Sequence, residues 1–172
     1  MMLVIGLGNP GTAYKHTYHN LGFEVLDLMR KQLAFPPFRN SVKLKSLVSK
    51  KGDVVLAKPQ TFMNRSGEAA SRLVKTYRSS RVLIVHDEID LPQNKMRVSK
   101  NSGSAGHKGV ESVMQHLKTG DIARIRIGIQ PTAGKPADLE GFVLKRFKQE
   151  EFEPILKEAV ELLEGQIKEN EG

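Results

Sequence analysis

The 172-residue sequence contains no cysteine. Disulfide bonds, thiol nucleophiles and thiolate metal sites are therefore excluded from its chemistry. No apolar run approaches the roughly 18 residues that a membrane-spanning helix needs, and the N-terminus lacks a basic region followed by a long apolar stretch. We therefore expect no membrane attachment and a cytoplasmic protein.

Three motifs that mark well-known classes of site are also absent. There is no G-x-S-x-G pentapeptide of an α/β-type serine esterase, and no G-x-x-x-x-G-K-[ST] phosphate-binding loop. The H-E-x-x-H pattern of a zinc site is missing as well; His16 and His19 could share a helix face, but no third ligand is evident. The sequence predicts neither a metal nor a cofactor.

Length and composition are typical of a soluble globular protein with one domain spanning residues 1–172. Hydrophobic residues make up 39% of the chain and charged residues 27%, which are ordinary proportions. The formal net charge is +8, and because residues 148–172 hold three lysines against eight glutamates, residues 1–147 carry +13. A basic body favours a polyanionic partner, most simply a nucleic acid, over charge that serves solubility alone.

Apolar spacing predicts strands and helices that interleave along the chain. Strands are predicted at MMLVI, VKLKSLV, VVLA, RVLIVH, KMRVS and ARIRIGI. Helices are predicted over residues 21–33, over SGEAASRLVKTY with Ser66 as its cap, and through VESVMQHL. A C-terminal amphipathic helix begins near Glu150, with an apolar face formed by Phe152, Ile155, Leu156, Ala159, Leu163 and Ile167. The predicted fold class is α/β, with a mixed, largely parallel central sheet flanked by helices.

The stretch GLGNPG, residues 6–11, has the G-x-G-x-x-G spacing of a dinucleotide-binding turn and follows a predicted strand. Such a turn must lead straight into a helix, but Pro10 pushes Asn9 toward an extended conformation. No helical spacing appears before Leu21, and the acidic residue expected about 20 positions further on is lacking, since Asp27 falls inside a predicted helix. A nucleotide-dependent oxidoreductase is therefore a distant alternative.

Polar side chains gather at the ends of the predicted strands, in GNPG, KPQTFMN, HDEIDLP and the Gly/Ser loop before VESVMQHL. Open α/β sheets bind ligands beyond their strand ends. A neutral histidine such as His19 or His107 could take a proton from water there, while Asp87 fixes its tautomer. The amides of Asn9 and Asn64 could donate to a developing oxyanion.

Each of these residues also has a structural interpretation. Asn9 before a proline suits an Asx turn, and Asn64 could cap the helix that follows it. Asp87 could be an ordinary residue at the end of a strand, and a lone histidine such as His19 is more often structural than catalytic. Composition and spacing alone therefore predict a basic α/β protein, and they leave hydrolysis open as one of its functions.

Taken together, the segments resemble the bacterial-type peptidyl-tRNA hydrolases. GLGNPGTAYKHTYHNLG is similar to that family's N-terminal signature, KPQTFMNRSG to its second, and HDEIDLPQNKMR with GSAGHKG to its third; RIRIGI and GFVLKRF follow in the family's order. The resemblance implies hydrolysis of the ester between a peptide and the terminal ribose of tRNA, by a monomer without metal or cofactor. The alternative is a non-catalytic RNA-binding relative.

The resemblance also implies roles for individual positions. His19 matches the family's catalytic base, and Asp87 matches its partner. Positions that bind the peptide or line its pocket are matched by Asn9, Tyr14, Phe62, Met63, Asn64, His107 and Lys108. Arg126 matches a basic residue of the family that helps to hold the terminal phosphate of tRNA. A second residue of this phosphate clamp is matched by Ser99, and the neighbouring Arg97 and Lys100 are candidates to take its place.

The sequence departs from the family pattern at four places. Lys108 stands where the family usually has asparagine, Tyr18 where it has arginine, and Asn94 where it has glycine, and the loop NSGSAG is poorer in glycine. None of these changes removes the His19 and Asp87 pair. Lys108 can donate hydrogen bonds but has no acceptor oxygen, so any role that needs an amide carbonyl must be lost.

Overall fold

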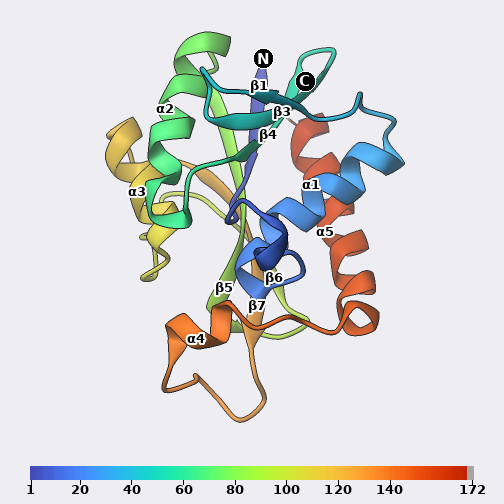
Figure 1. Cartoon of the computed structure of the whole chain (residues 1–172), viewed down its shortest axis with the longest axis vertical. Helices are drawn as coiled ribbons and strands as arrows, with labels where there is room; N and C mark the ends of the chain where they lie inside the picture. The colour runs from blue at the N-terminus through green and yellow to red at the C-terminus, as the bar shows by residue number, and fades with distance from the viewer. Residues whose placement is uncertain (170–172) are drawn as a thin grey trace.

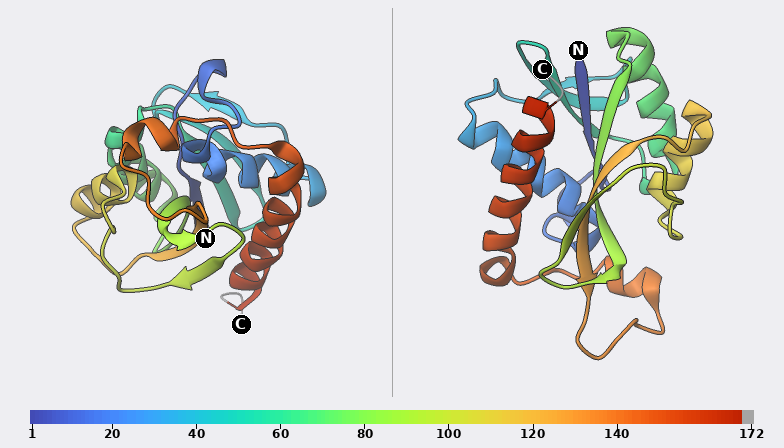
Figure 2. Two further views of the ribbon diagram at one scale, coloured as in Figure 1. Left: turned by 90° about the horizontal axis from the view of Figure 1, so that it is seen from below. Right: turned by 180° about the vertical axis from the view of Figure 1, so that it is seen from behind.

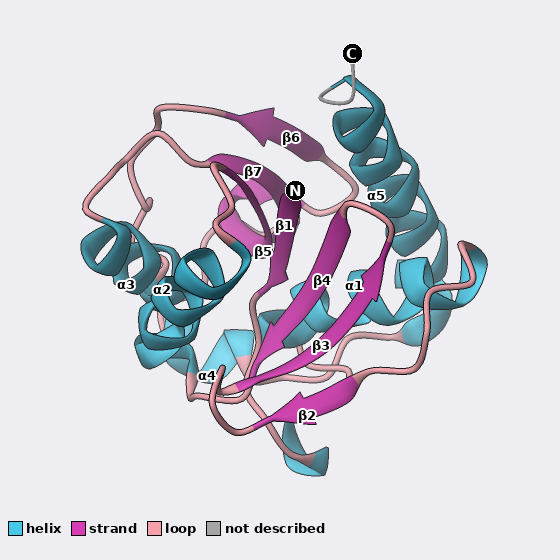
Figure 3. Cartoon of the chain, turned by 90° about the horizontal axis from the view of Figure 1, so that it is seen from above, coloured by secondary structure: helices cyan, strands magenta, loops and turns pink. Residues whose placement is uncertain are grey.

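A seven-stranded sheet forms the centre of the computed structural model, which describes residues 1–169 (Figures 1 and 3). Its strand order is β2-β3-β4-β1-β5-β7-β6. The strands are β1 (Met2–Gly6), β2 (Arg39–Ser41), β3 (Ser46–Lys51), β4 (Val54–Pro59), β5 (Arg81–Pro92), β6 (Met96–Ser99) and β7 (Ala123–Gln130). β4, β1, β5 and β7 run parallel, whereas β2, β3 and β6 pair antiparallel. The predicted mixed, largely parallel α/β sheet is confirmed.

Helices cover both faces of this sheet, as Figures 1 and 2 show from opposite sides. One face carries α1 (Leu21–Gln32) and α5 (Gln149–Glu169), and the other carries α2 (Ser66–Tyr77) and α3 (Lys108–Leu117). Alternation along the strands supplies both cores, because successive side chains point to opposite faces. Val4 and Val85 pack with α1 and α5, while Leu3 and Ile84 pack with α2 and α3.

The C-terminal amphipathic helix is confirmed as α5. Its predicted apolar positions are buried, except Leu156, which is partly buried against the same core. Within residues 1–169, no helix has both the length and the apolar character to cross a membrane.

Three local predictions are wrong. VKLKSLV is not one strand, because residues 42–45 form the turn between β2 and β3, where Lys45 has a φ of 49°. The strand RVLIVH does not end at Asp87: β5 runs on to Pro92, which pairs with Gln130 of β7 after an irregularity that follows Glu88. Ser66 does not cap α2: it is the first helical residue, and its hydroxyl donates to the carbonyl of Met63 at 2.7 Å.

The glycines of GLGNPG allow β1 and α1 to pack closely. Two 3₁₀ turns separate β1 from the start of α1, so the glycine turn does not lead directly into a helix. A Cβ at Gly6 would lie 2.4 Å from the carbonyl oxygen of Gly22, and a Cβ at Gly8 would lie 2.8 Å from the ring of Phe23. This close approach holds the segment before α1, which includes His19, beside the end of β1.

Replacing Gly22 with alanine should destabilise the protein strongly. The new Cβ would lie 2.4 Å from the carbonyl oxygen of Val85 and 2.5 Å from the amide nitrogen of Leu7, and neither backbone atom can move without shifting the sheet. We expect the free energy of unfolding, measured in urea, to fall by about 3 kcal/mol.

Gly165 in α5 provides the control, because a Cβ there would meet no other atom within 4 Å. Gly165→Ala should leave stability unchanged or raise it by up to about 1 kcal/mol, since alanine favours the helix. Equal stability of the two variants would contradict the tight contact of α1 with the sheet.

Candidate active site

A crevice of about 460 Å³ opens at the carboxyl end of the parallel strands. β1 stops at Gly6, whereas β5 and β7 continue beyond it, so the edge of β5 after Val85 has no neighbour on the β1 side. The loop after β1, the turn after β4, the start of α3 and the short helix α4 (Leu139–Val143) provide the walls. Ligands bind at this position in open α/β sheets.

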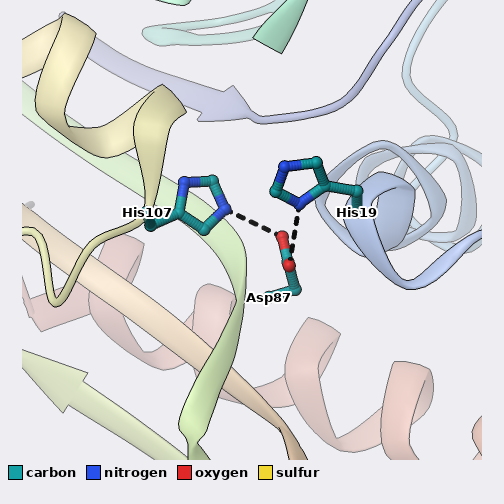
Figure 4. A group of neighbouring side chains, drawn as sticks. All are labelled: His19, Asp87 and His107. Carbon is teal, nitrogen blue, oxygen red and sulfur yellow. Dashed lines mark hydrogen bonds and ion pairs between the residues drawn. The ribbon is translucent and has the colours of Figure 1, made fainter. Parts of the chain in front are cut away.

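His19, Asp87 and His107 come from three separate segments and meet in this crevice (Figure 4). His19 lies in the 3₁₀ turn Tyr18–Asn20, Asp87 in β5, and His107 immediately before α3. Nδ1 of His19 is 2.9 Å from Oδ2 of Asp87, and Nε2 of His107 is 2.9 Å from Oδ1. One carboxylate therefore holds two imidazoles, one on each oxygen.

Neighbouring hydrogen bonds indicate which ring nitrogens carry protons. The amide of Val110 donates to Nδ1 of His107 at 3.3 Å, so the ring proton lies on Nε2 and is donated to Asp87. In His19, Nδ1 faces the carboxylate and carries the proton in the neutral ring. Nε2 of His19 is then left with a lone pair that can accept a proton.

The electrostatics of the site centre on Asp87. Burial works against its ionised form, but the interactions with His19 and His107 outweigh burial and hold the pKa of Asp87 well below its usual range. Burial also lowers the pKa of His19, whereas the charge and hydrogen bond of Asp87 raise it, and the balance is a raised pKa. Lys108 lowers the pKa of His19 by a smaller amount.

The same three side chains form a cluster that could hold a metal ion, because their ligand atoms lie within 4.8 Å of one another. Binding an ion at Nε2 of His107 would move the ring proton to Nδ1, against the amide proton of Val110. That hydrogen bond would be lost, so the observed arrangement suits proton transfer better than metal ligation.

Asn9 is held in place from two directions. Its backbone N–H donates to Oδ1 of Asn20 at 2.8 Å, and its carbonyl accepts from Nδ2 of Asn20 at 2.9 Å. Its side-chain oxygen accepts from the amide of Met63 at 2.8 Å, so Asn9 does not form an Asx turn. Within residues 1–169 no hydrogen bond engages its Nδ2, which can therefore donate toward the crevice. Asn20 was missed by sequence reasoning, although it is the direct neighbour of His19.

The remaining residues assigned to the substrate lie in or beside the crevice. Phe62, Asn64 and Lys108 line it, as does Met63. Phe62 is 54% exposed, and Tyr14 meets its ring edge-on with centroids 6.3 Å apart, so Tyr14 supports the rim rather than lining the crevice. Asn64 is exposed and does not cap α2, which has no side-chain cap.

The helix α4 closes one side of the crevice and was not predicted. Leu139, Glu140, Val143 and Leu144 of this segment line the crevice. Glu140 accepts a hydrogen bond from the ammonium group of Lys108 at 2.7 Å, which joins α4 to the start of α3. A helix of five residues is too short to show helical periodicity in the sequence.

The residues assigned to the tRNA lie outside the crevice, at the β6–β7 edge of the sheet. Arg97 pairs with Arg126 across β6 and β7. Nε of Arg126 donates to the buried carboxylate of Glu88 at 2.8 Å, and its Nη1 donates to the hydroxyl of Ser99 at 3.2 Å. The side chain of Arg126 is 14% exposed, so the exposed Arg97 and Lys100 are more accessible cations.

Comparison with known proteins agrees with this architecture. The model of the peptidyl-tRNA hydrolase family matches residues 3–171. The chain belongs to the peptidyl-tRNA hydrolase family. The peptidyl-tRNA hydrolase of Geobacillus thermodenitrificans is 43% identical over 167 residues, which cover 93% of this chain and 87% of that protein. That of Bdellovibrio bacteriovorus is 39% identical over 156 residues, covering 88% of this chain and 83% of that protein.

The fold agrees with that of a solved peptidyl-tRNA hydrolase. The crystal structure of the peptidyl-tRNA hydrolase from Acinetobacter baumannii matches with a TM-score of 0.82 and 29% identity, covering 98% of this chain and 91% of that chain. The resemblance seen in the sequence motifs is confirmed at the level of the peptidyl-tRNA hydrolase family. The roles of the individual residues stay predictions.

The pKa of His19, measured by NMR titration of its ring protons, should lie above the ordinary value of 6.5. Asp87→Asn removes the charge that raises this pKa but keeps the burial that lowers it, so the pKa should fall below that of the wild type. Asp121→Asn, at an exposed position, is the matched control and should have no effect. A pKa of His19 that is the same with and without the Asp87 charge would contradict the ion pair.

Proposed function

We propose that this chain hydrolyses the ester between a peptide and the 3′-terminal ribose of tRNA, which frees the tRNA for reuse. The observation that carries the proposal is the His19–Asp87 pair at the end of the sheet, facing a crevice, in a chain that belongs to the peptidyl-tRNA hydrolase family. The reaction needs a base for water, a site for the developing oxyanion and a surface for each half of the substrate.

His19 supplies the base. Its Nε2 takes a proton from water as the water oxygen attacks the ester carbonyl carbon, while Asp87 keeps hold of Nδ1–H and stabilises the imidazolium that forms. The imidazolium then gives its proton to the ribose oxygen as the bond between the carbonyl carbon and that oxygen breaks. His107 keeps the Asp87 carboxylate ionised and oriented through its own hydrogen bond.

The peptide half of the substrate lies in the crevice. Nδ2 of Asn9 and the amide of Asn64 donate to carbonyl oxygens, and the ammonium of Lys108 adds a positive charge at the same wall. Apolar side chains of the crevice accept the side chains of the peptide, and these are Phe62, Met63, Ile89, Val143 and Leu144.

The tRNA half lies over the basic edge of the sheet, on Arg97, Lys100 and Arg126. Arg97 and Lys100 are exposed and can contact phosphates directly, while Arg126 keeps part of its guanidinium engaged with Glu88. The excess of +13 in residues 1–147 draws the polyanion to this surface. We further infer that the protein acts as a monomer in the cytoplasm, without a metal or cofactor.

Loss of the base should abolish most of the activity. A positioned general base is worth about 10² to 10⁴ in rate, so His19→Ala should lower turnover by that factor with the fold intact. The assay follows release of free tRNA from peptidyl-tRNA, and circular dichroism checks the fold. His116→Ala, at an exposed position of α3, is the control and should keep wild-type turnover. A folded His19→Ala protein with near wild-type turnover would refute the role of His19.

Salt should weaken binding of the tRNA half. Phosphates that are neutralised by protein cations release counterions, so KM for peptidyl-tRNA should rise with salt. Arg97→Ala and Lys100→Ala should each raise KM and reduce the salt slope by roughly one unit or less. Neither should affect a short aminoacyl ester that lacks the tRNA body.

Lys50 is an exposed cation on β3, distant from this edge in the strand order, so Lys50→Ala controls for the loss of one charge. If Lys50→Ala reduced the salt dependence of KM as much as Arg97→Ala, tRNA binding would depend on the net charge of the protein and not on contacts at this edge. Equal losses on the short ester and on peptidyl-tRNA would count against phosphate contacts at Arg97 and Lys100.

A further inference from the structure

Arg124 is a completely buried arginine that the proposed reaction does not use. It lies in β7, two residues before Arg126, and its exposed fraction is 0%. Within residues 1–169 no carboxylate forms an ion pair with it, and its Nε–H has no hydrogen-bond partner. A buried guanidinium is stable only if hydrogen bonds replace its lost hydration. For Arg124 these bonds come from uncharged acceptors in two places.

The first place is the loop between β6 and α3. Nη2 of Arg124 donates to the carbonyl and hydroxyl of Ser102 at 3.2 and 2.5 Å, and to the carbonyl of Gly103 at 2.6 Å. The amide of His107 donates to the carbonyl of Ser104 at 3.0 Å, so one short turn separates the anchored residues from His107. Arg124 therefore fastens this loop to β7 just before His107.

The second place is the ring of His86. Nη1 of Arg124 lies 3.2 Å from Nε2 of His86, and because arginine can only donate, Nε2 must accept and the ring proton lies on Nδ1. Nδ1–H of His86 donates to the carbonyl of Asp87 at 2.6 Å. Burial, reinforced by His107 and Arg124, holds the pKa of His86 well below its usual range, so the ring is neutral.

His86 in turn touches His107. Their rings meet edge-on with centroids 4.8 Å apart. Both oxygens of Asp87 are engaged at the same time, one by His19 and one by His107. Arg124 thus reaches both partners of the Asp87–His107 hydrogen bond. It acts on His107 through the loop and on Asp87 through His86.

We propose that Arg124 is a positioning residue for hydrolysis: its hydrogen bonds to Ser102, Gly103 and His86 hold His107 and Asp87 in the geometry that orients His19. The inference rests on the proposed function, since correct positioning of these groups would speed the chemical step of hydrolysis. It also gives two neighbouring arginines different roles. Arg126 acts on the bound tRNA, and Arg124 acts on the residues around the base.

Arg124→Met tests this role, because methionine fills much of the same volume and donates no hydrogen bond. We expect kcat for peptidyl-tRNA to fall by about 10- to 100-fold, as catalytic groups lose their alignment. KM and its dependence on salt should stay near the wild-type values. Arg72→Met, which removes an exposed arginine bonded to the carbonyl of Lys43, is the matched control and should keep wild-type kcat.

Nitrogen-15 NMR of the histidine rings gives a readout that does not depend on activity. In the wild type, His86 should be the neutral Nδ1–H tautomer, and the Nε2–H proton of His107 should be visible as a hydrogen-bonded signal. In Arg124→Met, the bond from Nδ1–H to the carbonyl of Asp87 keeps this tautomer, but Nε2 of His86 loses its donor, so its signal should shift and the His107 signal should weaken. If the wild type proves inactive, the proposed function fails, and these signals still decide whether Arg124 positions His107.

A loop variant keeps the test decisive if Arg124→Met does not fold. Two glycines inserted between Gly103 and Ser104 would lengthen the link between the anchored residues and His107, at a position where a Cβ meets nothing within 4 Å. We expect a similar fall in kcat with the Nε2 signal of His86 unchanged, because Arg124 still donates to it, whereas the same insertion after Gly120 should have no effect.

Wild-type kcat in either Arg124→Met or the Gly103 insertion would overturn the proposal. A raised KM with unchanged kcat in Arg124→Met would overturn it too, because that result would make Arg124 a tRNA-binding residue. Unaltered His86 and His107 signals in Arg124→Met would likewise overturn the proposal.

Discussion

A single buried carboxylate, that of Asp87, holds the candidate active site together. Its two oxygens accept from His19 and His107, which lie 68 residues before it and 20 residues after it in the chain. A buried charge is tolerated only when it is paired and hydrogen-bonded. The turn before α1 and the start of α3 must therefore both converge on β5, and the sheet must leave that part of β5 open. The early end of β1 at Gly6 provides this opening.

The departures from the family pattern have local explanations in this fold. Asn94 has a φ of 71°, in the region that glycine favours and that asparagine tolerates better than most residues. Tyr18 stacks on Phe142 with centroids 4.7 Å apart, and so attaches α4 next to His19. Lys108 is paired with Glu140 and 62% exposed, so its charge acts on His19 from the rim of the crevice. None of these contacts displaces the His19–Asp87 pair.

The strand β7 carries two arginines with different surroundings. Arg124 and Arg126 are two residues apart, so their side chains leave the same face of the sheet. Among residues 1–169, Arg126 has a carboxylate partner, Glu88, and keeps some exposure, whereas Arg124 has neither. Arg124 is closed in by the loop that leads to His107. A short stretch of alternating sequence thus supplies both a surface cation and an internal support.

Much of the fold could be predicted from the sequence, because a strand or helix with one buried face has apolar residues at a regular spacing along the chain. The runs RVLIVH and ARIRIGI and the apolar face of α5 follow from that spacing alone. VKLKSLV shows the limit, since alternation does not reveal that the chain reverses direction at Lys45. Motifs in the sequence also indicated the peptidyl-tRNA hydrolase family, which the comparisons confirm.

Other features depended on the tertiary structure, because they are contacts between segments that are distant in sequence. Asn20 holding Asn9, Glu140 meeting Lys108 and Arg124 reaching His86 span 11, 32 and 38 residues. No local pattern encodes such distances: each depends on how β1, β5 and β7 are aligned and on which loops pack over their ends. The sequence by itself determined the α/β layers and the family, and the packing of the layers decided which polar groups meet.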